Sequence, residues 1–469
     1  MSFGFKPYLL LLLGALCHAS TVANQPNILL LFSDDAGYAD FGFQGSPTHQ
    51  TPHLDSIANT GVRFTRAYVS GPVCSPSRAG LLSGKYQQFF GHGNNLPNPH
   101  PMGLPLDIKL MPEYLQELGY GTYMIGKWHL GIPEPYQPQN RGFDRFFGIL
   151  EGARSYHKIK NPSLGKALVE NGQRFQEEAG LYVTDLFGDK AIEFLNDHFD
   201  QDPNKPFFMY LSFTAPHSPM DAKEEDIHAL DHVEFESEER KINAAMTLAM
   251  DREVGRILEL LKARGELDNT MVIFLNDNGG AGRSNHSSNL PLRGHKSSMF
   301  EGGVRVPMLV SWPSGGIPKG VDFDGVTSSF DLLPTFIRMA GGSLSPDWEL
   351  EGRDLMPYLR GDRVGDPHAT LAWRFNGYKG RKALLHRGWK YINWEGSESL
   401  FHIESDPCEK KNLAKQNPNK VDTMRTMLLA WEANAMQPLW WWNKDYERKY
   451  ALPPEELSSL PIHLTDNVN

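Results

Sequence analysis

Short apolar runs recur along the first two thirds of the chain, and amphipathic helical patterns separate them. The run Asn27–Phe32 reads NILLLF and lies between Pro26 and Ser33. A run of this length with almost no polar position indicates a strand that is buried on both faces, as in a parallel sheet. The alternation predicts an α/β fold with helices on both faces of a mostly parallel sheet. Similar runs occupy residues 120–125, 206–213, 271–275 and 308–312, and helical patterns occupy residues 181–199, 236–262 and 329–340.

Polar side chains follow these runs directly. In open α/β sheets ligands bind at the carboxyl ends of strands, so we expect these side chains to meet at one site. Asp34 and Asp35 follow the first run, although an isolated Asp-Asp pair can instead cap a helix. Lys127 and His129 follow the second run. Because they are two residues apart, their side chains lie on the same face if the chain stays extended. Two later runs are followed by His217, Asp277 and Asn278.

Residues 74–84, CSPSRAGLLSG, follow a strand that we predict over residues 62–69. Pro76 suits the first turn of a helix, and Leu81 and Leu82 supply apolar positions beyond it. Cys74 would then lie at a helix N-terminus, where free N–H groups, the helix dipole and Arg78 favour an anion. Without this context, a lone cysteine is more often a buried structural residue.

Cys74, Pro76, Arg78, Leu82 and Gly84 resemble the signature of the formylglycine-dependent sulfatases of the arylsulfatase-like type I group. In that family a formylglycine-generating enzyme oxidises the cysteine, so the resemblance implies that residue 74 becomes 3-oxoalanine. Residues 293–307 and 400–414 also resemble family segments. The resemblance implies an alkaline-phosphatase-like fold, mostly parallel and sandwiched by helices, with a smaller C-terminal α+β domain on an antiparallel sheet.

The resemblance also implies a role for each side chain of the site. One hydroxyl of the hydrated aldehyde at position 74 attacks sulfur, and His217 protonates the leaving oxygen. His129 then takes a proton from the other hydroxyl, which expels sulfate and restores the aldehyde. The cations that hold the developing charge are Arg78, Lys127 and Lys296.

Four side chains offer hard oxygen ligands from two loops: Asp34, Asp35, Asp277 and Asn278. Oxygen donors without a cysteine or histidine suit Ca²⁺ better than Zn²⁺. We therefore expect one bound calcium ion, which would polarise a sulfate oxygen and orient the hydrated aldehyde.

Charge and length limit the partners and the domains. The chain has 469 residues and a formal net charge of −10 at pH 7. Such a chain is not expected to bind nucleic acid, and an anionic substrate must be held by a local group of cations. We expect a catalytic domain over residues 21–365 and a C-terminal subdomain over residues 366–469. Strands at 371–375, 381–386 and 389–394 and a helix at 421–433 are predicted within the subdomain.

Residues 1–20 have the pattern of a signal peptide, with Lys6 before an apolar run over residues 8–16. The run is too short to span a bilayer, and Leu16 before Cys17 disfavours attachment of a lipid. We expect cleavage and export to the periplasm or the medium, without membrane attachment afterwards. Cys74 and Cys408 remain, and we expect both to be unpaired, because a disulfide would consume the nucleophile.

The substrate expected from export and from the many aromatic residues is a sulfated oligo- or polysaccharide. Residues 87–95, QQFFGHGNN, resemble a segment of polysaccharide sulfatases from marine bacteria. A galactose sulfate of carrageenan type is the first candidate and a glycosaminoglycan sulfate the second. The alternatives are a phosphonate or phosphodiester hydrolase of the same superfamily and a non-catalytic protein that binds sulfated glycans.

Two further motifs have a structural interpretation beside a functional one. The run Trp440–Trp442 indicates packing more often than a platform for sugars. The sequon Asn285-His286-Ser287 lies in a predicted active-site loop and gives little support for glycosylation.

Overall fold

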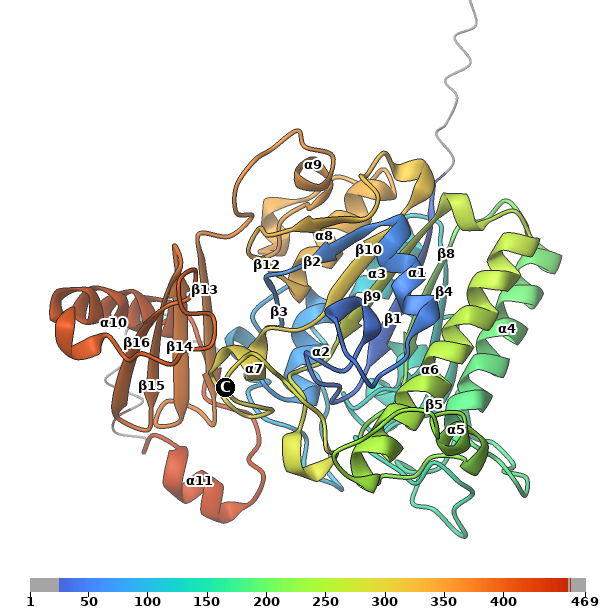
Figure 1. Ribbon diagram of the computed structural model, residues 1–469, viewed down its shortest axis with the longest axis horizontal. Helices are drawn as coiled ribbons and strands as arrows, with labels where there is room; N and C mark the ends of the chain where they lie inside the picture. The colour runs from blue at the N-terminus through green and yellow to red at the C-terminus, as the bar shows by residue number, and fades with distance from the viewer. Residues whose placement is uncertain (1–24, 454–455, 457–469) are drawn as a thin grey trace, which may run out of the picture.

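The computed structural model describes residues 25–453 and residue 456. A large α/β body and a smaller C-terminal sheet lie side by side (Figure 1). The predicted signal peptide, residues 1–20, lies outside the described residues. Within the described part of the chain, no helix combines the length and the apolarity needed to cross a membrane.

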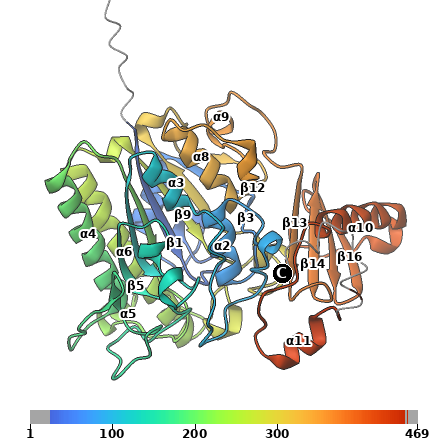
Figure 2. The same ribbon diagram turned by 180° about the vertical axis from the view of Figure 1, so that it is seen from behind.

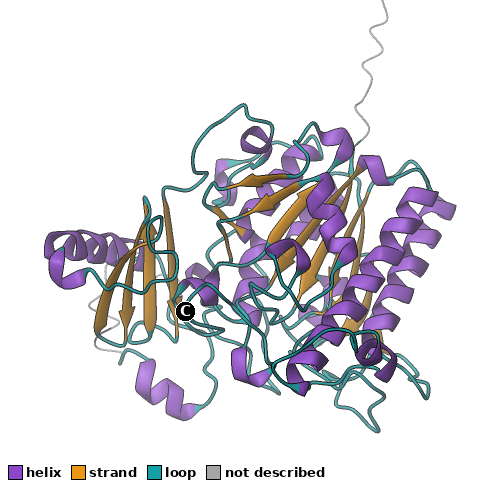
Figure 3. Ribbon diagram, in the orientation of Figure 1, coloured by secondary structure: helices purple, strands orange, loops and turns teal. Residues whose placement is uncertain are grey.

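The large body is built on a sheet of ten strands (Figure 3). These are β1 (Asn27–Ser33), β2 (Val62–Phe64), β4 (Gly121–Lys127), β5 (Arg145–Ile149), β6 (Val169–Glu170), β7 (Gln173–Arg174), β8 (Phe207–Ser212), β9 (Thr270–Asn276), β10 (Met308–Ser311) and β11 (Val321–Phe323). Their order is β11-β2-β10-β9-β1-β8-β4-β5-β6-β7, and the strands from β9 to β5 run parallel. The predicted α/β fold is confirmed.

Helices cover both faces of this sheet (Figures 1 and 2). Alternate residues of β1 contribute to the two hydrophobic cores: Leu29 and Leu31 to one, Leu30 and Phe32 to the other. Because all four side chains are fully buried, the run has no place for a polar residue between them. The first core includes α1 (Pro52–Thr60), α4 (Val183–Gln201) and α6 (Glu238–Ala263), and the second includes α2 (Cys74–Ser83), α3 (Met111–Glu117) and α8 (Leu332–Met339).

The pairing register brings four strand ends to the same level. Ser33 of β1 pairs with Asn276 of β9, and Phe32 of β1 pairs with Ser212 of β8. Ser212 also pairs with Gly126 of β4. The segments that follow β9, β1, β8 and β4 therefore leave the sheet together, which places the polar residues after each strand close to one another.

The C-terminal body is a four-stranded antiparallel sheet covered on one face by α10 (Pro418–Glu432). Its strands are β13 (Thr370–Phe375), β14 (Arg381–His386), β15 (Trp389–Trp394) and β16 (Ser397–His402). The predicted antiparallel sheet is confirmed, and β16 is a strand that the sequence analysis did not identify. The domain boundary at residue 366 stays a prediction.

Buried polar contacts join the two bodies. Nζ of Lys390 in β15 lies 2.7 Å from Oε1 of Glu301 in α7 (Glu301–Val304), and both side chains are fully buried. The indole of Trp373 donates to the carbonyl oxygen of Val69 at 2.7 Å. Because a buried charge needs a partner, the pair of Lys390 and Glu301 holds the small sheet against α7. The hydrogen bond of Trp373 holds it against the segment that leads to Cys74.

Two segments differ from their expected structure. The strand predicted over residues 62–69 is divided into β2 and β3 (Ala67–Tyr68), because β2 pairs with β10 and β11 whereas β3 pairs with β12 (Thr327–Ser328). Residues 133–180 have no regular hydrophobic period, so the sequence predicts no strand there, but they supply β5, β6 and the edge strand β7 at one end of the sheet. These strands are two to five residues long, too short for a period to show.

Candidate active site

Cys74 is the first residue of α2, and every residue of this helix is buried. The predicted helix start is therefore confirmed, and Cys74 and Cys408 are both free, as expected. The helix packs closely: a Cβ on Gly80 would lie 2.0 Å from Oγ of Ser70. Gly84 ends the helix with a φ of 67°, in the left-handed region that favours glycine. The stretch 74–84 thus includes two glycines that the placement of Cys74 requires.

Three buried carboxylates surround the thiol of Cys74. Its Sγ lies 3.6 Å from Oδ1 of Asp34 and 4.0 Å from Oδ1 of Asp35, the two residues that follow β1. Asp277, after β9, accepts a hydrogen bond from the backbone N–H of Asp35 at 3.2 Å. β1 and β9 pair in parallel and end at the same level, so the loops that follow them meet beside the cysteine.

Each carboxylate has a cationic partner. Burial of three like charges in one place would be very costly without opposite charges beside them. Nζ of Lys296 also lies 3.1 Å from Sγ of Cys74, which makes it the cation nearest the thiol. The pairs are Lys127 with Asp34 at 2.6 Å, Lys296 with Asp35 at 2.8 Å and Arg78 with Asp277 at 3.1 Å.

These contacts set the charge state of the acids. Burial raises the pKa of Asp35, but the positive charges around it, of which Lys296 acts most strongly, together outweigh burial, and the pKa lies below its usual value. Burial likewise opposes ionisation of Asp277, and Arg78 holds the pKa of that carboxyl below its usual value. Burial raises the pKa of the Cys74 thiol to about 12. Asp35 and Asp277 are therefore ionised beside a neutral thiol.

Asn278 completes an oxygen-rich cluster. Its Nδ2 donates to Oδ1 of Asp35 at 2.7 Å, whereas its Oδ1 is buried and has no hydrogen-bond partner among the described residues. A buried oxygen without a donor costs free energy unless a ligand satisfies it. Donor atoms of Asp34, Asp35, Cys74 and His217 lie within 4.8 Å of one another. Apart from the thiol and the imidazole, the oxygen donors of Asp34, Asp35, Asp277 and Asn278 fit a hard cation such as Ca²⁺.

His217 follows β8 and has a hydrogen-bond acceptor beside each ring nitrogen. Its Nε2 lies 3.4 Å from Oδ2 of Asp35, and its Nδ1 lies 2.6 Å from the carbonyl oxygen of Ser218. Carboxylate and carbonyl oxygens only accept, so both ring nitrogens are placed to donate. This arrangement suits a side chain that gives a proton away.

His129 has the opposite surroundings. Its Nδ1 is buried and finds no hydrogen-bond partner within the described chain. Burial and the positive charges of Lys127 and Arg78 hold the pKa of His129 well below its usual value, so the ring is neutral and can accept a proton. The expected alternation of Lys127 and His129 along an extended chain is wrong. β4 ends at Lys127, and His129 has a φ of 59°, so a left-handed turn directs its side chain.

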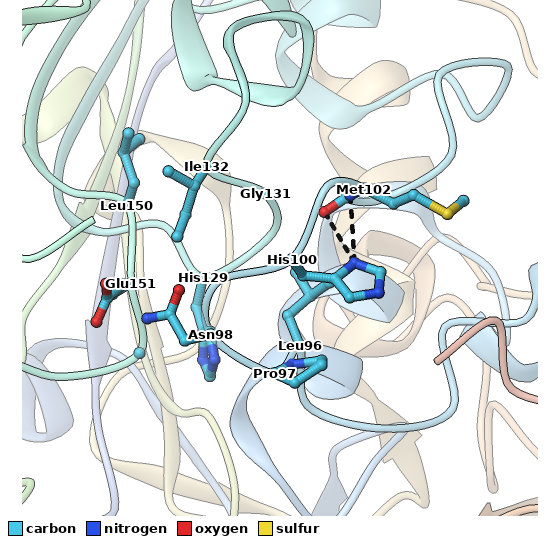
Figure 4. Close-up of a pocket in the computed structure, with 11 residues that line it drawn as sticks. Leu96, Pro97, Asn98, His100, Met102, His129, Gly131, Ile132, Leu150 and Glu151 are labelled. Carbon is cyan, nitrogen blue, oxygen red and sulfur yellow. Dashed lines mark hydrogen bonds between the residues drawn. The ribbon is translucent and has the colours of Figure 1, made fainter. Parts of the chain in front are cut away.

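A cavity of about 580 Å³ opens onto Cys74 between the two bodies. A smaller hollow adjoins it at His129, where Asn98 and Glu151 contribute to the wall (Figure 4). Arg78 and Lys127 are fully buried and lie behind the cavity surface. From the large body the lining includes Cys74, His129, His217 and Lys296, and from the C-terminal part it includes Phe375, Asn376, Arg381, Trp442 and Tyr446.

Two residues that position the site were not identified from the sequence. Asn285 is fully buried, and its Nδ2 donates to the carbonyl oxygens of Asp35 and Pro216 at 2.8 and 3.1 Å. The sequon asparagine therefore supports the loops of the site and is inaccessible to a glycan. Ser212, the last residue of β8, accepts a hydrogen bond from Arg78. Its place at a strand end is the one signal in the sequence that points to it.

Comparison with known proteins agrees with this geometry. The sequence profile of the sulfatase family matches residues 26–342, and the profile described as N-sulphoglucosamine sulphohydrolase, C-terminal, matches residues 295–433. Arylsulfatase J of Mus musculus is 35% identical over 470 residues, covering 88% of this chain and 77% of the relative. N-acetylgalactosamine-6-sulfatase of Sus scrofa is 34% identical over 471 residues, covering 90% of this chain and 88% of the relative.

Solved structures show the same similarity. The crystal structure of Ps i-CgsB matches with a TM-score of 0.85 and 34% identity, over 92% of this chain and 99% of that one. Its complex with k-i-k-neocarrahexaose matches equally well. The family match, the relatives and the fold agree over most of the chain. The chain therefore belongs to the sulfatase family and is a sulfuric ester hydrolase.

Proposed function

We propose that this sulfatase removes sulfate from a sulfated carbohydrate, with galactose sulfate of a carrageenan-type polysaccharide as the first candidate. The observation that carries the proposal is the similarity to Ps i-CgsB, 34% identical over 92% of this chain, together with the structure of that protein with k-i-k-neocarrahexaose. The cavity of about 580 Å³ above Cys74 is in the size range of small-molecule sites and suits a sugar unit.

A glycosaminoglycan sulfate is the second candidate. The N-acetylgalactosamine-6-sulfatases of Sus scrofa and Homo sapiens are 34% and 33% identical to this chain. Both candidates require the same reaction at sulfur, and they differ in the sugar that fills the outer part of the cavity.

Export forms a further part of the proposal. Lys6 and the apolar run over residues 8–16 support removal of a signal peptide. A periplasmic or secreted enzyme would meet sulfated polysaccharides outside the cytoplasm.

In this proposal a formylglycine-generating enzyme converts Cys74 to formylglycine before the site is active. The hydrated aldehyde would supply the hydroxyl that attacks sulfur. The surroundings of Cys74 support this role, because Lys296 lies 3.1 Å from its Sγ and both histidines line the same cavity. Lys296 would hold the charge of the sulfate group, and Lys127 and Arg78 would add positive charge one layer deeper.

The two histidines would divide the proton transfers. His217, with an acceptor beside each nitrogen, would donate a proton to the oxygen of the departing sugar. His129, whose buried Nδ1 has no partner within the described chain, would accept the proton that is released when sulfate leaves. Environments that differ in this way are typical of paired acid and base groups.

Calcium is the metal that we propose for the oxygen-rich cluster. A bound Ca²⁺ would polarise a sulfate oxygen and orient the group at position 74. Asn278 supports this assignment, because its buried Oδ1 otherwise lacks a partner among the described residues. The side chains that would hold the ion are Asp34, Asp35, Asp277 and Asn278.

Replacing Asn278 by Ala should weaken calcium binding at least about tenfold, a loss of about 1.4 kcal/mol, because the variant lacks one oxygen ligand. Isothermal titration of the metal-stripped protein with CaCl₂ measures this change. The matched control is Asn412→Ala, since the oxygen of Asn412 already accepts from the backbone N–H of Leu400 and Ala414. Equal calcium affinity in all three proteins, or tighter binding of Zn²⁺ than of Ca²⁺, would contradict the site.

Replacing His217 by Ala should slow hydrolysis of sugar sulfates by about 10²–10⁴-fold, because an alcohol leaves poorly without a proton. Hydrolysis of 4-nitrophenyl sulfate should decrease much less, because its leaving oxygen is stable as an anion. Replacing His129 by Ala should slow both substrates alike. Steady-state kinetics on the two substrates measures the difference.

His228→Ala is the control for loss of an imidazole, because His228 is exposed and does not line the cavity. The assignment is reversed if the His129 variant shows the dependence on leaving group and the His217 variant does not.

Release of inorganic sulfate from a panel of oligosaccharides tests the substrate. We expect the highest kcat/KM for a carrageenan hexasaccharide with galactose sulfate, and lower values for 6-sulfated N-acetylgalactosamine. A preference for the amino sugar would favour the second candidate. Cleavage of a phosphodiester or phosphonate ester with no release of sulfate would overturn the proposal.

A further inference from the structure

The aromatic run at residues 440–442 is divided between two environments. Trp440 is 3% exposed, packs against the ring of His92 with centroids 4.6 Å apart, and donates its indole N–H to the carbonyl oxygen of Asn94 at 2.9 Å. This is the packing role expected for the run. Trp442 is instead 59% exposed, and Tyr446 is 40% exposed. Two large aromatic surfaces are thus left open to solvent.

These two exposed rings lie at the catalytic cavity. Trp442 and Tyr446 line the same cavity of about 580 Å³ as Cys74 and His217. A substrate whose sulfate group reaches Cys74 must extend outward through this cavity, because the carboxylates and Arg78 close the other side. Trp442 and Tyr446 are therefore among the residues within reach of the part of the substrate beyond the sulfate ester.

The segment that carries the rings is held in place at several points. The backbone N–H groups of Met436 and Leu439 donate to the carbonyl oxygens of Gln88 and Gly91, at 2.8 and 2.9 Å. Asn443 caps α11 (Lys444–Tyr450), its Oδ1 accepting from two backbone N–H groups. These contacts connect Trp442 to the segment that follows the Cys74 helix. A backbone fixed in this way loses little conformational entropy when a ligand packs on the side chains that it carries.

The C-terminal end of the same segment is fixed to the small sheet. The hydroxyl of Tyr450 donates to Glu395 at 2.9 Å, and Tyr446 packs against Tyr450 with ring centroids 5.6 Å apart. Figure 1 shows α11 below the small sheet, at the end of a loop that descends from between the two bodies. Both exposed rings are therefore part of a supported surface.

Polar groups accompany the rings, as recognition of a sugar requires. Arg381 and Asn376 come from the small sheet and line the cavity near them. The guanidinium of Arg381 lies 4.1 Å from the ring centroid of Trp394 and donates to the carbonyl oxygen of Ser297 at 2.7 Å, so its position is set. A pyranose ring has an apolar face for an aromatic surface and hydroxyls at its edge for such polar groups.

We propose that Trp442 and Tyr446 form a sugar subsite at the mouth of the catalytic cavity, where the ring next to the sulfated unit packs. The proposal rests on the proposed function, since it assigns the partner of that same site. It makes the C-terminal segment a determinant of specificity: a small aryl sulfate uses the bottom of the cavity, and an oligosaccharide uses the bottom and the mouth.

The test compares two substrates and three variants. In Trp442→Ala, the ratio of kcat/KM for a carrageenan hexasaccharide to kcat/KM for 4-nitrophenyl sulfate should decrease about tenfold, mainly through KM, as loss of one stacked aromatic implies. Trp442→Phe, which keeps a ring, should restore most of the ratio. Trp389→Ala, which removes a partly buried tryptophan of β15 outside the cavity, should leave the ratio unchanged. A ratio unchanged in Trp442→Ala, or reduced equally in Trp389→Ala, would overturn the proposal.

Binding measured without turnover separates the subsite from the reaction. In a Cys74→Ala background, titration with the hexasaccharide should show about tenfold weaker affinity when Trp442 is also replaced by Ala. That result would support the subsite even if the parent released no sulfate, and the proposed function alone would then fail. The opposite outcome is also informative. If the parent releases sulfate but both Cys74→Ala proteins bind the hexasaccharide equally tightly, the proposed function stands and the subsite is overturned.

Discussion

Everything in this site depends on a buried group of opposite charges. Asp34, Asp35 and Asp277 each lie within 3.1 Å of a cationic side chain, and all three carboxylate side chains are at most 3% exposed. None of these charges could be buried alone, so the chain must bring both signs to one place. In the proposed function these cations would act locally, at the point where the sulfate ester reaches a chain whose net charge is −10.

The site combines reactive groups from the large body with a cavity mouth from both bodies. The acids, the histidines and Lys127 lie at or just after the ends of adjacent strands, Arg78 lies in the helix that begins at Cys74, and Lys296 lies in the loop before α7. The outer wall includes side chains of the small sheet and of the segment before α11. A change of the outer wall would alter which sulfated molecule fits without moving the reactive groups. The buried contact of Lys390 with Glu301 keeps the two parts in register.

Most of the reactive part could be predicted from the sequence, because apolar strands that end in polar residues determine where Asp34 and Asp277 emerge. The remainder depends on information that no local pattern contains. The turn at His129 arises from a φ of 59°, the edge strands β6 and β7 have two residues each, and Asn285 acquires its role through contacts with distant loops. Trp440 and Trp442 are near neighbours in one run, and only tertiary packing assigns one to the core and the other to the cavity.

In the proposed mechanism the neutral, buried thiol of Cys74 is the precursor of the nucleophile. Mass spectrometry of the peptide that contains residue 74 tests this role, with protein produced with and without a formylglycine-generating enzyme. Sulfate release is expected to rise in proportion to the fraction of residue 74 found as formylglycine, and Cys74→Ala is expected to be inactive. Full activity in protein whose residue 74 is entirely unmodified cysteine would contradict it.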